Sequence, residues 1–162
     1  MAVRAGRFRH AVIGAVILAL LLVAAPATPA QALDARRPGR IQTLVERKIN
    51  NARTARGLAP LKVNAKVEYW SIDHARHMAR RGQLEHDSIT RLRRESPRRA
   101  VAWSENIARN TAANAARRAH RMWMRSPGHR ANILNPLTTH MGVGVVKRGG
   151  YTYIVQRFTT LH

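Results

Sequence analysis

Residues 123–134 read Trp-Met-Arg-Ser-Pro-Gly-His-Arg-Ala-Asn-Ile-Leu. An alanine-rich helical pattern runs into this stretch and ends at Ser-Pro-Gly, because proline cannot continue the helical hydrogen-bond ladder and glycine readily takes φ > 0. His129 follows at once, so the turn can aim an imidazole at whatever faces the helix end. We expect this turn to converge with residues 85–88 and 104–107 on one polar pocket.

The first 32 residues have the pattern of a secretory signal peptide. Three arginines precede an apolar run over residues 11–25, which is short for a membrane span of about 20 residues. Residues 30–32, Ala-Gln-Ala, then fit the small-x-small cleavage pattern. An uncleaved anchor is the alternative, but the short run and the prolines that follow it favour cleavage. We therefore expect a secreted protein, extracellular or associated with the cell wall.

The rest of the chain predicts one domain. Residues 33–40 are basic and contain proline, which indicates a flexible lead-in. Residues 41–162 are long enough to bury a core. The chain has no cysteine, so no disulfide can stabilise it.

The composition is strongly basic, with 29 Lys and Arg against 8 Asp and Glu. Without the signal-peptide arginines the net charge is +18. In an exported protein this charge indicates an anionic wall polymer or anionic lipid as partner, although a basic surface without a specific partner explains it equally well. Nucleic acid is not expected, because the arginine-rich stretch lacks interleaved aromatic residues. Membrane contact is expected only through the signal peptide, and the oligomeric state is not determined.

Hydrophobic periodicity predicts three helices followed by a β-hairpin. The expected helices run from Ile41 to a stop at Gly57, over residues 65–81 between Asn64 and Gly82, and from a Thr111 cap to Met124. The expected strands are residues 142–146 and 151–158, joined by a turn at residues 147–150.

Several polar residues stand out against this pattern. Glu105 lies in an otherwise apolar stretch, where an unpaired carboxylate is costly to desolvate, so it is either a site residue or the partner of an arginine. His86 lies in a loop where no apolar period requires it. His74 and His77 have a spacing that could bind metal, but a structural role is expected for both.

Taken together, the segments resemble the CAP superfamily (cysteine-rich secretory proteins, antigen 5 and pathogenesis-related 1) in its short bacterial form. The matching stretches are Asn-Asn-Ala-Arg at 50–53, Gly-Leu-Ala-Pro-Leu at 57–61, His-Asp-Ser at 86–88, Glu-Asn-Ile-Ala at 105–108, residues 123–134, Gly-Val-Gly-Val at 142–145 and Tyr-Ile-Val-Gln-Arg-Phe at 153–158. The resemblance implies an α+β fold, an α-β-α sandwich with a three-stranded antiparallel sheet between helical layers. Residues 105–108 would form the third strand, beside the hairpin.

The resemblance also implies a cavity lined by two histidines and two acidic residues. His86 matches the first histidine, Glu105 the first glutamate, and His129 the second histidine. Ser126 stands where the family has its second glutamate, so one carboxylate is missing. We therefore predict His86, Glu105, His129 and Ser126 as ligand-binding residues, and His86, His129 and Glu105 as metal ligands.

Two neutral imidazoles and a carboxylate can hold a divalent ion such as Zn²⁺ with a water in an open position. Such a water would be acidified and could hydrolyse a bond. Without metal, Glu105 and a histidine could act as acid and base, but no nucleophile is evident. Because the second acid is replaced, we predict a non-enzymatic binding module for a cell-wall, lipid or peptide ligand. The alternative is a metal-dependent hydrolase acting on peptide or wall polymer.

Overall fold

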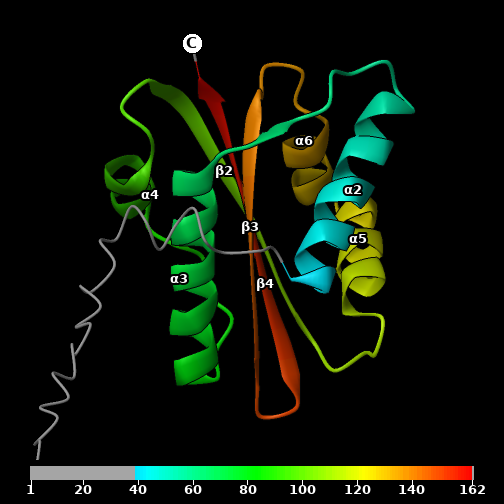
Figure 1. The fold of residues 1–162 in the computed structure, drawn as a ribbon, viewed down its shortest axis with the longest axis vertical. Helices are drawn as coiled ribbons and strands as arrows, with labels where there is room; N and C mark the ends of the chain where they lie inside the picture. Colours follow the sequence, from blue (N-terminus) through cyan, green and yellow to red (C-terminus); the bar gives the residue numbers. More distant parts are fainter. Residues whose placement is uncertain (1–38, 162) are drawn as a thin grey trace, which may run out of the picture.

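A mixed sheet of four strands separates the helices into two layers (Figure 1). The computed structural model describes residues 39–161, so the predicted signal peptide and nearly all of the lead-in lie outside the described residues. The strands are β1 (Lys62–Val63), β2 (Ala100–Asn110), β3 (His140–Arg148) and β4 (Tyr151–Leu161). The helices are α2 (Arg40–Thr54), α3 (Ala65–Arg81), α4 (Ile89–Glu95), α5 (Ala115–Arg125) and α6 (Pro127–Leu134). Helices α2, α5 and α6 lie on one side of the sheet, and α3 and α4 lie on the other.

The expected α-β-α layers are present, but the three-stranded antiparallel sheet is a wrong prediction. The strand order is β1-β3-β4-β2, and β2, β3 and β4 pair antiparallel as expected. The additional strand β1 pairs in parallel with β3 through Lys62 and Val63. A strand of two residues has no room for a hydrophobic period, so the sequence pattern could not indicate it.

Helix α3 has the bounds that its sequence signals predict. The Asn64 side chain accepts hydrogen bonds from the backbone N–H groups of Lys66 and Val67, as an N-cap does. Gly82 ends the helix in the left-handed region, at φ 68°. The prediction for residues 65–81 is therefore confirmed.

Two glycines in β3 allow α3 to lie directly on the sheet. Ser71 Oγ donates a hydrogen bond to the Gly142 carbonyl at 3.0 Å, which shows how close the two elements approach. A Cβ atom at Gly144 would overlap with the backbone of Ser71 and Ile72. Neither strand glycine has a positive φ, so each is required for space and not for backbone freedom.

Residues 123–134 do not form the predicted turn. Helix α5 starts at Ala115 and not after Thr111, and it ends at Arg125. Pro127 then occupies the first turn of α6, a position where its missing N–H is not needed. Gly128 has no positive φ. His129 therefore projects from the first turn of a new helix, and the expectation of a left-handed glycine turn is wrong.

The same stretch covers the outer edge of β2. Trp123 Nε1 donates to the Ile107 carbonyl at 3.0 Å, and Asn132 Nδ2 donates to the Glu105 carbonyl at 3.3 Å. These two carbonyls belong to the edge of β2 that pairs with no other strand of the described sheet. Side chains of α5 and α6 thus satisfy polar groups of an edge strand that would otherwise be open to pairing with another chain.

A buried cation holds the other end of α6. The Arg53 side chain of α2 is fully buried, and its Nη1 donates to the carbonyls of Ile133 and Asn135 at 2.9 and 2.8 Å. Positive charge is favourable at a helix C-terminus. This interaction therefore fixes α6 relative to α2.

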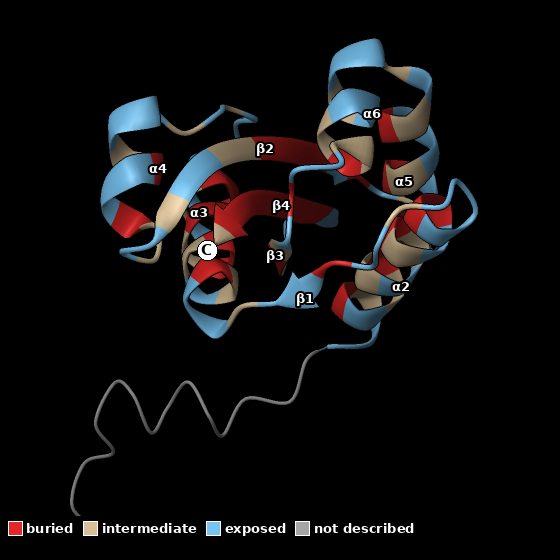
Figure 2. Ribbon diagram, turned by 90° about the horizontal axis from the view of Figure 1, so that it is seen from above, coloured by how far each residue is buried: buried red, intermediate tan, exposed pale blue. Residues whose placement is uncertain are grey.

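Apolar side chains fill both interfaces between helices and sheet. In Figure 2 the buried parts of the helices are those that face the strands. One core cluster joins α2, α5 and α6 to the sheet and includes Trp123 and Phe158. The second joins α3 to Ile107, Tyr153 and Val155. Within residues 39–161, no helix has the length and apolar character needed to span a membrane.

Because α3 lies directly on β3, alanine at Gly144 should destabilise the fold much more than alanine at Gly128. Gly144→Ala should lower the free energy of unfolding by about 3 kcal/mol or more, because the added methyl group meets backbone that cannot rotate away. Gly128→Ala is the matched control, since a Cβ atom at this position of α6 would have nothing within 4 Å of it, and it should stay within about 1 kcal/mol of the parent, on the stabilising side. Urea unfolding curves measure both, and equal stabilities of the two variants would contradict the close packing.

Candidate functional site

His86, Glu105 and His129 meet at the outer edge of β2. His86 lies in the loop between α3 and α4, Glu105 lies in β2, and His129 lies in α6. His86 Nδ1 is 2.9 Å from Glu105 Oε1. The rings of His86 and His129 are stacked, with centroids 6.4 Å apart and an interplanar angle of 26°. The structure therefore brings the three side chains together, while their role as ligands stays a prediction.

Ser126 orients the ring of His129. Ser126 Oγ lies 2.8 Å from His129 Nδ1. The backbone is held as well, because Asn106 Nδ2 donates to the His129 carbonyl at 3.1 Å. Asn132 Nδ2 in turn donates to Asn106 Oδ1 at 2.9 Å. The serine that replaces the expected second glutamate thus positions an imidazole.

The two imidazoles share one arrangement. In each ring Nδ1 faces a protein oxygen, from Glu105 or from Ser126. Among residues 39–161, no hydrogen bond engages Nε2 of either His86 or His129. The His86 side chain is 56% exposed, so solvent reaches it. A histidine whose Nδ1 is held by an oxygen and whose Nε2 is free has the usual geometry of a metal ligand with its supporting partner.

His129 is held in the form that binds metal. Burial lowers its pKa below the ordinary 6.5, and the neighbouring charge of His86 lowers the pKa further. The neutral imidazole, which carries the lone pair, therefore predominates at neutral pH.

Glu105 is buried and both of its carboxylate oxygens are engaged. Oε1 accepts from His86 and from the backbone N–H of Asp87 at 3.1 Å. Oε2 accepts from Arg157 Nε at 3.1 Å. Glu105 and Arg157 are directly opposite in the pairing of β2 with β4. The alternative that Glu105 is the partner of an arginine is confirmed, and because the residue also contacts His86, its role as a site residue stays a prediction.

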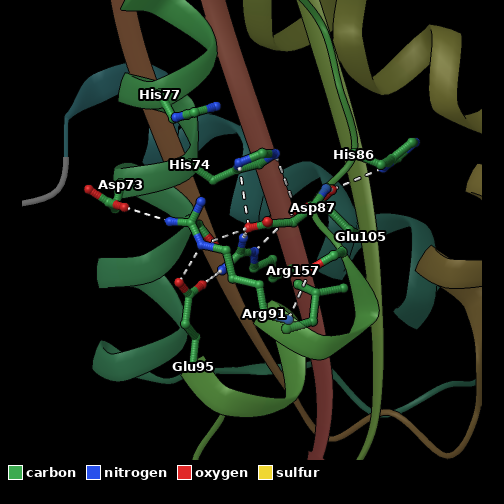
Figure 3. Close-up of polar contacts among 12 residues, drawn as sticks. Asp73, His74, His77, His86, Asp87, Arg91, Glu95, Glu105 and Arg157 are labelled. Atoms are coloured by element: carbon green, nitrogen blue, oxygen red, sulfur yellow. Dashed lines mark hydrogen bonds and ion pairs between the residues drawn. The ribbon is translucent and has the colours of Figure 1, made fainter.

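Arg157 is the centre of a buried ion network (Figure 3). Its side chain is 5% exposed and contacts three carboxylates. These are Glu105, Glu95 through Nη1 at 2.7 Å, and Asp87 through Nη2. Arg91 extends the network, pairing with Glu95 at 2.5 Å and, at the protein surface, with Asp73 at 2.8 Å. Four carboxylates thus surround two guanidinium groups, and the histidines lie beside the remaining negative charge.

His74 forms a second group that could hold a metal. His74, Asp87 and Glu105 each offer a ligand atom, and these atoms lie within 4.8 Å of one another. His74 Nε2 lies 3.0 Å from the Glu85 carbonyl, while buried Nδ1 has no hydrogen-bond partner among the described residues and is 3.5 Å from Asp87 Oδ2. The sequence favours a structural role for His74, and the fold brings the carboxylates of Asp87 and Glu105 beside it.

The buried group fits a metal less well than the pair of His86 and His129 does. Arg157 already contacts both of its carboxylates, so a divalent cation would have to share or displace a guanidinium group. Among residues 39–161, the buried Nδ1 of His74 has no hydrogen-bond partner, whereas each of the two carboxylates is already paired with Arg157. At His86 and His129, the two Nε2 atoms form no hydrogen bond with any described residue, and each ring is already oriented through Nδ1. The buried group therefore supports the site by fixing Glu105.

The importance of Arg157 and Asp87 was not apparent from the sequence. A signal existed for Arg157, since it is charged within the buried strand at residues 153–158, just as Glu105 is within its own strand. Two opposite charges in two neighbouring apolar strands indicate an ion pair. Asp87 gave no comparable signal, because the residue before a helix cap is often acidic.

Removal of the central cation should be costly. Arg157→Met leaves Asp87, Glu95 and Glu105 without their shared guanidinium, and should lower the free energy of unfolding by about 3–5 kcal/mol. Arg94→Met removes an exposed arginine of α4 that forms no ion pair within residues 39–161, and should change stability by less than about 0.5 kcal/mol. Chemical denaturation measures the free energy of unfolding of the two variants. Similar losses of stability in both would show that the network does not stabilise the fold.

The pKa of His129 should depend on the presence of the neighbouring His86 ring. By NMR titration it should lie below 6.5, and in His86→Ala it should rise yet remain below 6.5, because burial is the larger cause. The unfolded chain then takes up this proton more readily than the folded one, so His129 removes stability as the pH falls through about 6.5. An unchanged His129 pKa in His86→Ala would disprove the coupling of the two rings.

Known proteins resemble this chain in sequence and in fold. The family model of the cysteine-rich secretory protein family, CAP, matches residues 46–158. The uncharacterized protein YkwD of Bacillus subtilis (strain 168) is 30% identical over 103 residues, which are 62% of this chain and 40% of that protein. The chain therefore spans about two-fifths of the length of this relative.

Solved structures share the fold. An extracellular protein containing a SCP domain from Bacillus anthracis str. Ames is 26% identical with a TM-score of 0.63, over 85% of this chain and 45% of that chain. An outer surface protein from Borrelia burgdorferi is 15% identical with a TM-score of 0.70, over 78% and 97% of the two chains. NaASP2, crystallised with Zn²⁺, is 13% identical with a TM-score of 0.59, over 77% and 82%. The last two likenesses show the fold alone.

The family model covers more than half of the chain, and its match includes His86, Glu105 and His129. The fold is shared with solved structures, among them the SCP-domain protein from Bacillus anthracis. The chain belongs to the cysteine-rich secretory protein (CAP) family.

Proposed function

We propose that this chain is a secreted, non-enzymatic CAP-domain binding module whose ligand site is the histidine pair at the edge of β2. The observation that carries the proposal is the shared arrangement of His86 and His129. Each ring is held at Nδ1 by a protein oxygen, at 2.9 Å from Glu105 and 2.8 Å from Ser126, and the rings stack at 6.4 Å. Oriented rings of this kind are prepared to bind before any ligand arrives.

A divalent metal, with Zn²⁺ as the first choice, fits this pair. The ligand atoms would be Nε2 of His86 and Nε2 of His129, and Glu105 and Ser126 would orient them. Zinc accepts imidazole nitrogen, and a bound zinc with two protein ligands keeps positions open for oxygen donors of a ligand. The crystallisation of the CAP protein NaASP2 with Zn²⁺ supports the choice of metal. Glu105 thereby changes from the metal ligand predicted by the resemblance to a positioning residue.

Secretion is supported from two sides. The first 32 residues have the pattern of a signal peptide, with an apolar run over residues 11–25 and Ala-Gln-Ala at residues 30–32. The relatives include an extracellular protein and an outer surface protein. The chain would therefore act outside the cytoplasm, on a cell-wall, lipid or peptide ligand.

Binding is favoured over hydrolysis by the state of the carboxylate. A hydrolase needs a base that is free to take a proton from water or substrate. Both oxygens of Glu105 are engaged by His86, Asp87 and Arg157, and Ser126 stands where the family has its second acid. No observation of this structure favours the metal-dependent hydrolase.

Calorimetric titration with Zn²⁺ tests the proposal. His86→Ala and His129→Ala should each weaken zinc binding at least tenfold, because each removes one of two ligand nitrogens. His140→Ala, which changes a histidine of β3 outside the site, should leave the affinity unchanged. Zinc affinity that is unchanged in both site variants but lost in His74→Ala would assign the metal to the buried group of His74, Asp87 and Glu105. That result would contradict the proposal.

Ser126→Ala separates orientation from ligation in the same titration. The ring of His129 keeps Nε2 but loses its partner at Nδ1, so the affinity should fall about 10-fold to 100-fold. Ser126→Thr retains the hydroxyl and should restore most of the binding. Loss of binding in both variants alike would mean that the hydroxyl does not orient the ring.

A further inference from the structure

Charge is distributed unequally between the two helical layers. Seven acidic residues occur among residues 39–161, and six of them lie in or beside α3, α4 and β2. Helices α2, α5 and α6 together carry nine Arg and Lys residues and a single acid, Glu46. The layer opposite the ion network is therefore the strongly positive side of the molecule.

Helix α5 concentrates this charge on its outer surface. Ala115, Ala116, Ala119 and Trp123 form its buried side. With 100° between successive residues, its four arginines fall within an arc of about 100° opposite that side. These residues are Arg117, Arg118, Arg121 and Arg125, and all are exposed. Residues four apart rise by about 6 Å along the helix, so they offer a row of guanidinium groups at regular intervals.

A groove continues the row onto α6. It lies between α5 and α6, has a volume of about 370 Å³, and is lined by Arg125 and Arg130 together with Met124, Pro127, Ala131 and Leu134. We call the four arginines of α5 and Arg130 the arginine face. Among residues 39–161, no side chain of the arginine face forms an ion pair or a hydrogen bond within the protein. Their charges are thus available to a partner.

Positive charge also extends from α5 onto α2. The pKa of His120, on α5, is lowered by burial and then by the charges of Lys48 and Arg56. Both of these residues belong to α2 or directly follow it. A positive potential therefore spans the contact between the two helices.

The apolar content of this layer argues for a polymer and against a bilayer. Within the described parts of α2, α5 and α6, Met122 is the only large apolar side chain that is exposed. A helix that lies in a membrane interface needs a continuous apolar face beside its basic one, whereas the apolar side of α5 is buried against the sheet. Guanidinium groups bind phosphate oxygens in pairs of parallel hydrogen bonds, which suits them to a chain of phosphates.

We infer that the arginine face binds a linear polymer whose charges are phosphate groups, at a surface separate from the histidine pair. The polymer lies along α5 and enters the groove between Arg125 and Arg130, while the carboxylates of α3, α4 and β2 leave the other layer less positive. This surface would hold the protein to an anionic polymer outside the cell. It does not depend on the metal proposed for His86 and His129.

The test compares two variants of equal net charge. One carries Arg117→Gln, Arg121→Gln, Arg125→Gln and Arg130→Gln in the arginine face. The control carries Arg76→Gln, Arg80→Gln, Arg94→Gln and Arg98→Gln, which are exposed arginines in or next to α3 and α4. Binding of inorganic polyphosphate is measured by calorimetry over a series of NaCl concentrations, and circular dichroism and zinc affinity confirm that both variants retain the fold and the other site.

The wild type should bind polyphosphate with an affinity that falls steeply with salt. The arginine-face variant should bind at least tenfold more weakly at 0.1 M NaCl, and the slope of log K against log [NaCl] should become shallower by about 3, from about 0.7 per lost phosphate contact. The polyphosphate affinity of the control variant should stay within about twofold of wild type, because its substitutions remove only long-range electrostatic attraction, which salt screens. Equal losses in both variants, no loss in the arginine-face variant, or no binding by the wild type would overturn the inference.

Binding to anionic vesicles tests whether the arginine face binds a membrane surface instead of a polymer. Vesicles of phosphatidylglycerol and phosphatidylcholine present the same phosphate chemistry on a bilayer. They should bind more weakly per phosphate than polyphosphate does, and Met122→Ser should not change their binding. Tighter binding to vesicles that is lost in Met122→Ser would assign the face to a membrane surface and overturn the polymer.

Discussion

The Glu105–Arg157 pair is the interaction on which the geometry of the site depends. The two residues face each other across β2 and β4, and both are buried. A carboxylate at this depth is tolerated only when its oxygens are paired. Arg157 holds Oε2, which leaves Oε1 to meet His86 and the backbone N–H of Asp87. The same guanidinium binds Glu95 of α4, so one cation fixes the loop that carries His86 and the helix that follows it.

The edge position of β2 explains why two helical layers contribute to one site. A strand in the middle of the sheet would separate His86, which comes from the α3–α4 side, from His129, which comes from α6. At the edge both rings reach around the strand and stack on each other. Trp123 and Asn132 satisfy the edge carbonyls of Ile107 and Glu105, so the segment that supplies His129 also protects the strand. Residues 123–134 therefore both protect the edge of β2 and supply Ser126 and His129 to the site.

The parts of the fold that the sequence could predict are those with local signals. Asn64 and Gly82 mark the ends of α3, and the turn at Gly149 and Gly150, both with positive φ, connects β3 and β4. The wrong predictions lie where the local sequence signal is ambiguous or missing. A proline after a helix can also start the next helix, as Pro127 does. Strand β1 is too short to show a hydrophobic period. In the site, His86, Glu105 and His129 were found through motifs. Asp87 and Arg157 were missed because their importance lies in contacts between residues 52 to 70 positions apart.

Glu105 holds the His86 ring through Nδ1, and we propose that Nε2 of this ring is left for a ligand. A carboxylate only accepts, so without metal the neutral form of the His86 ring must carry its proton on Nδ1. Long-range ¹H–¹⁵N correlation NMR reads the protonation of the two ring nitrogens directly. The contact with Glu105 predicts the Nδ1–H tautomer for the neutral ring of wild-type His86, and Glu105→Ala, which removes the acceptor, should abolish this preference. A predominant Nε2–H tautomer in the wild-type protein would contradict it.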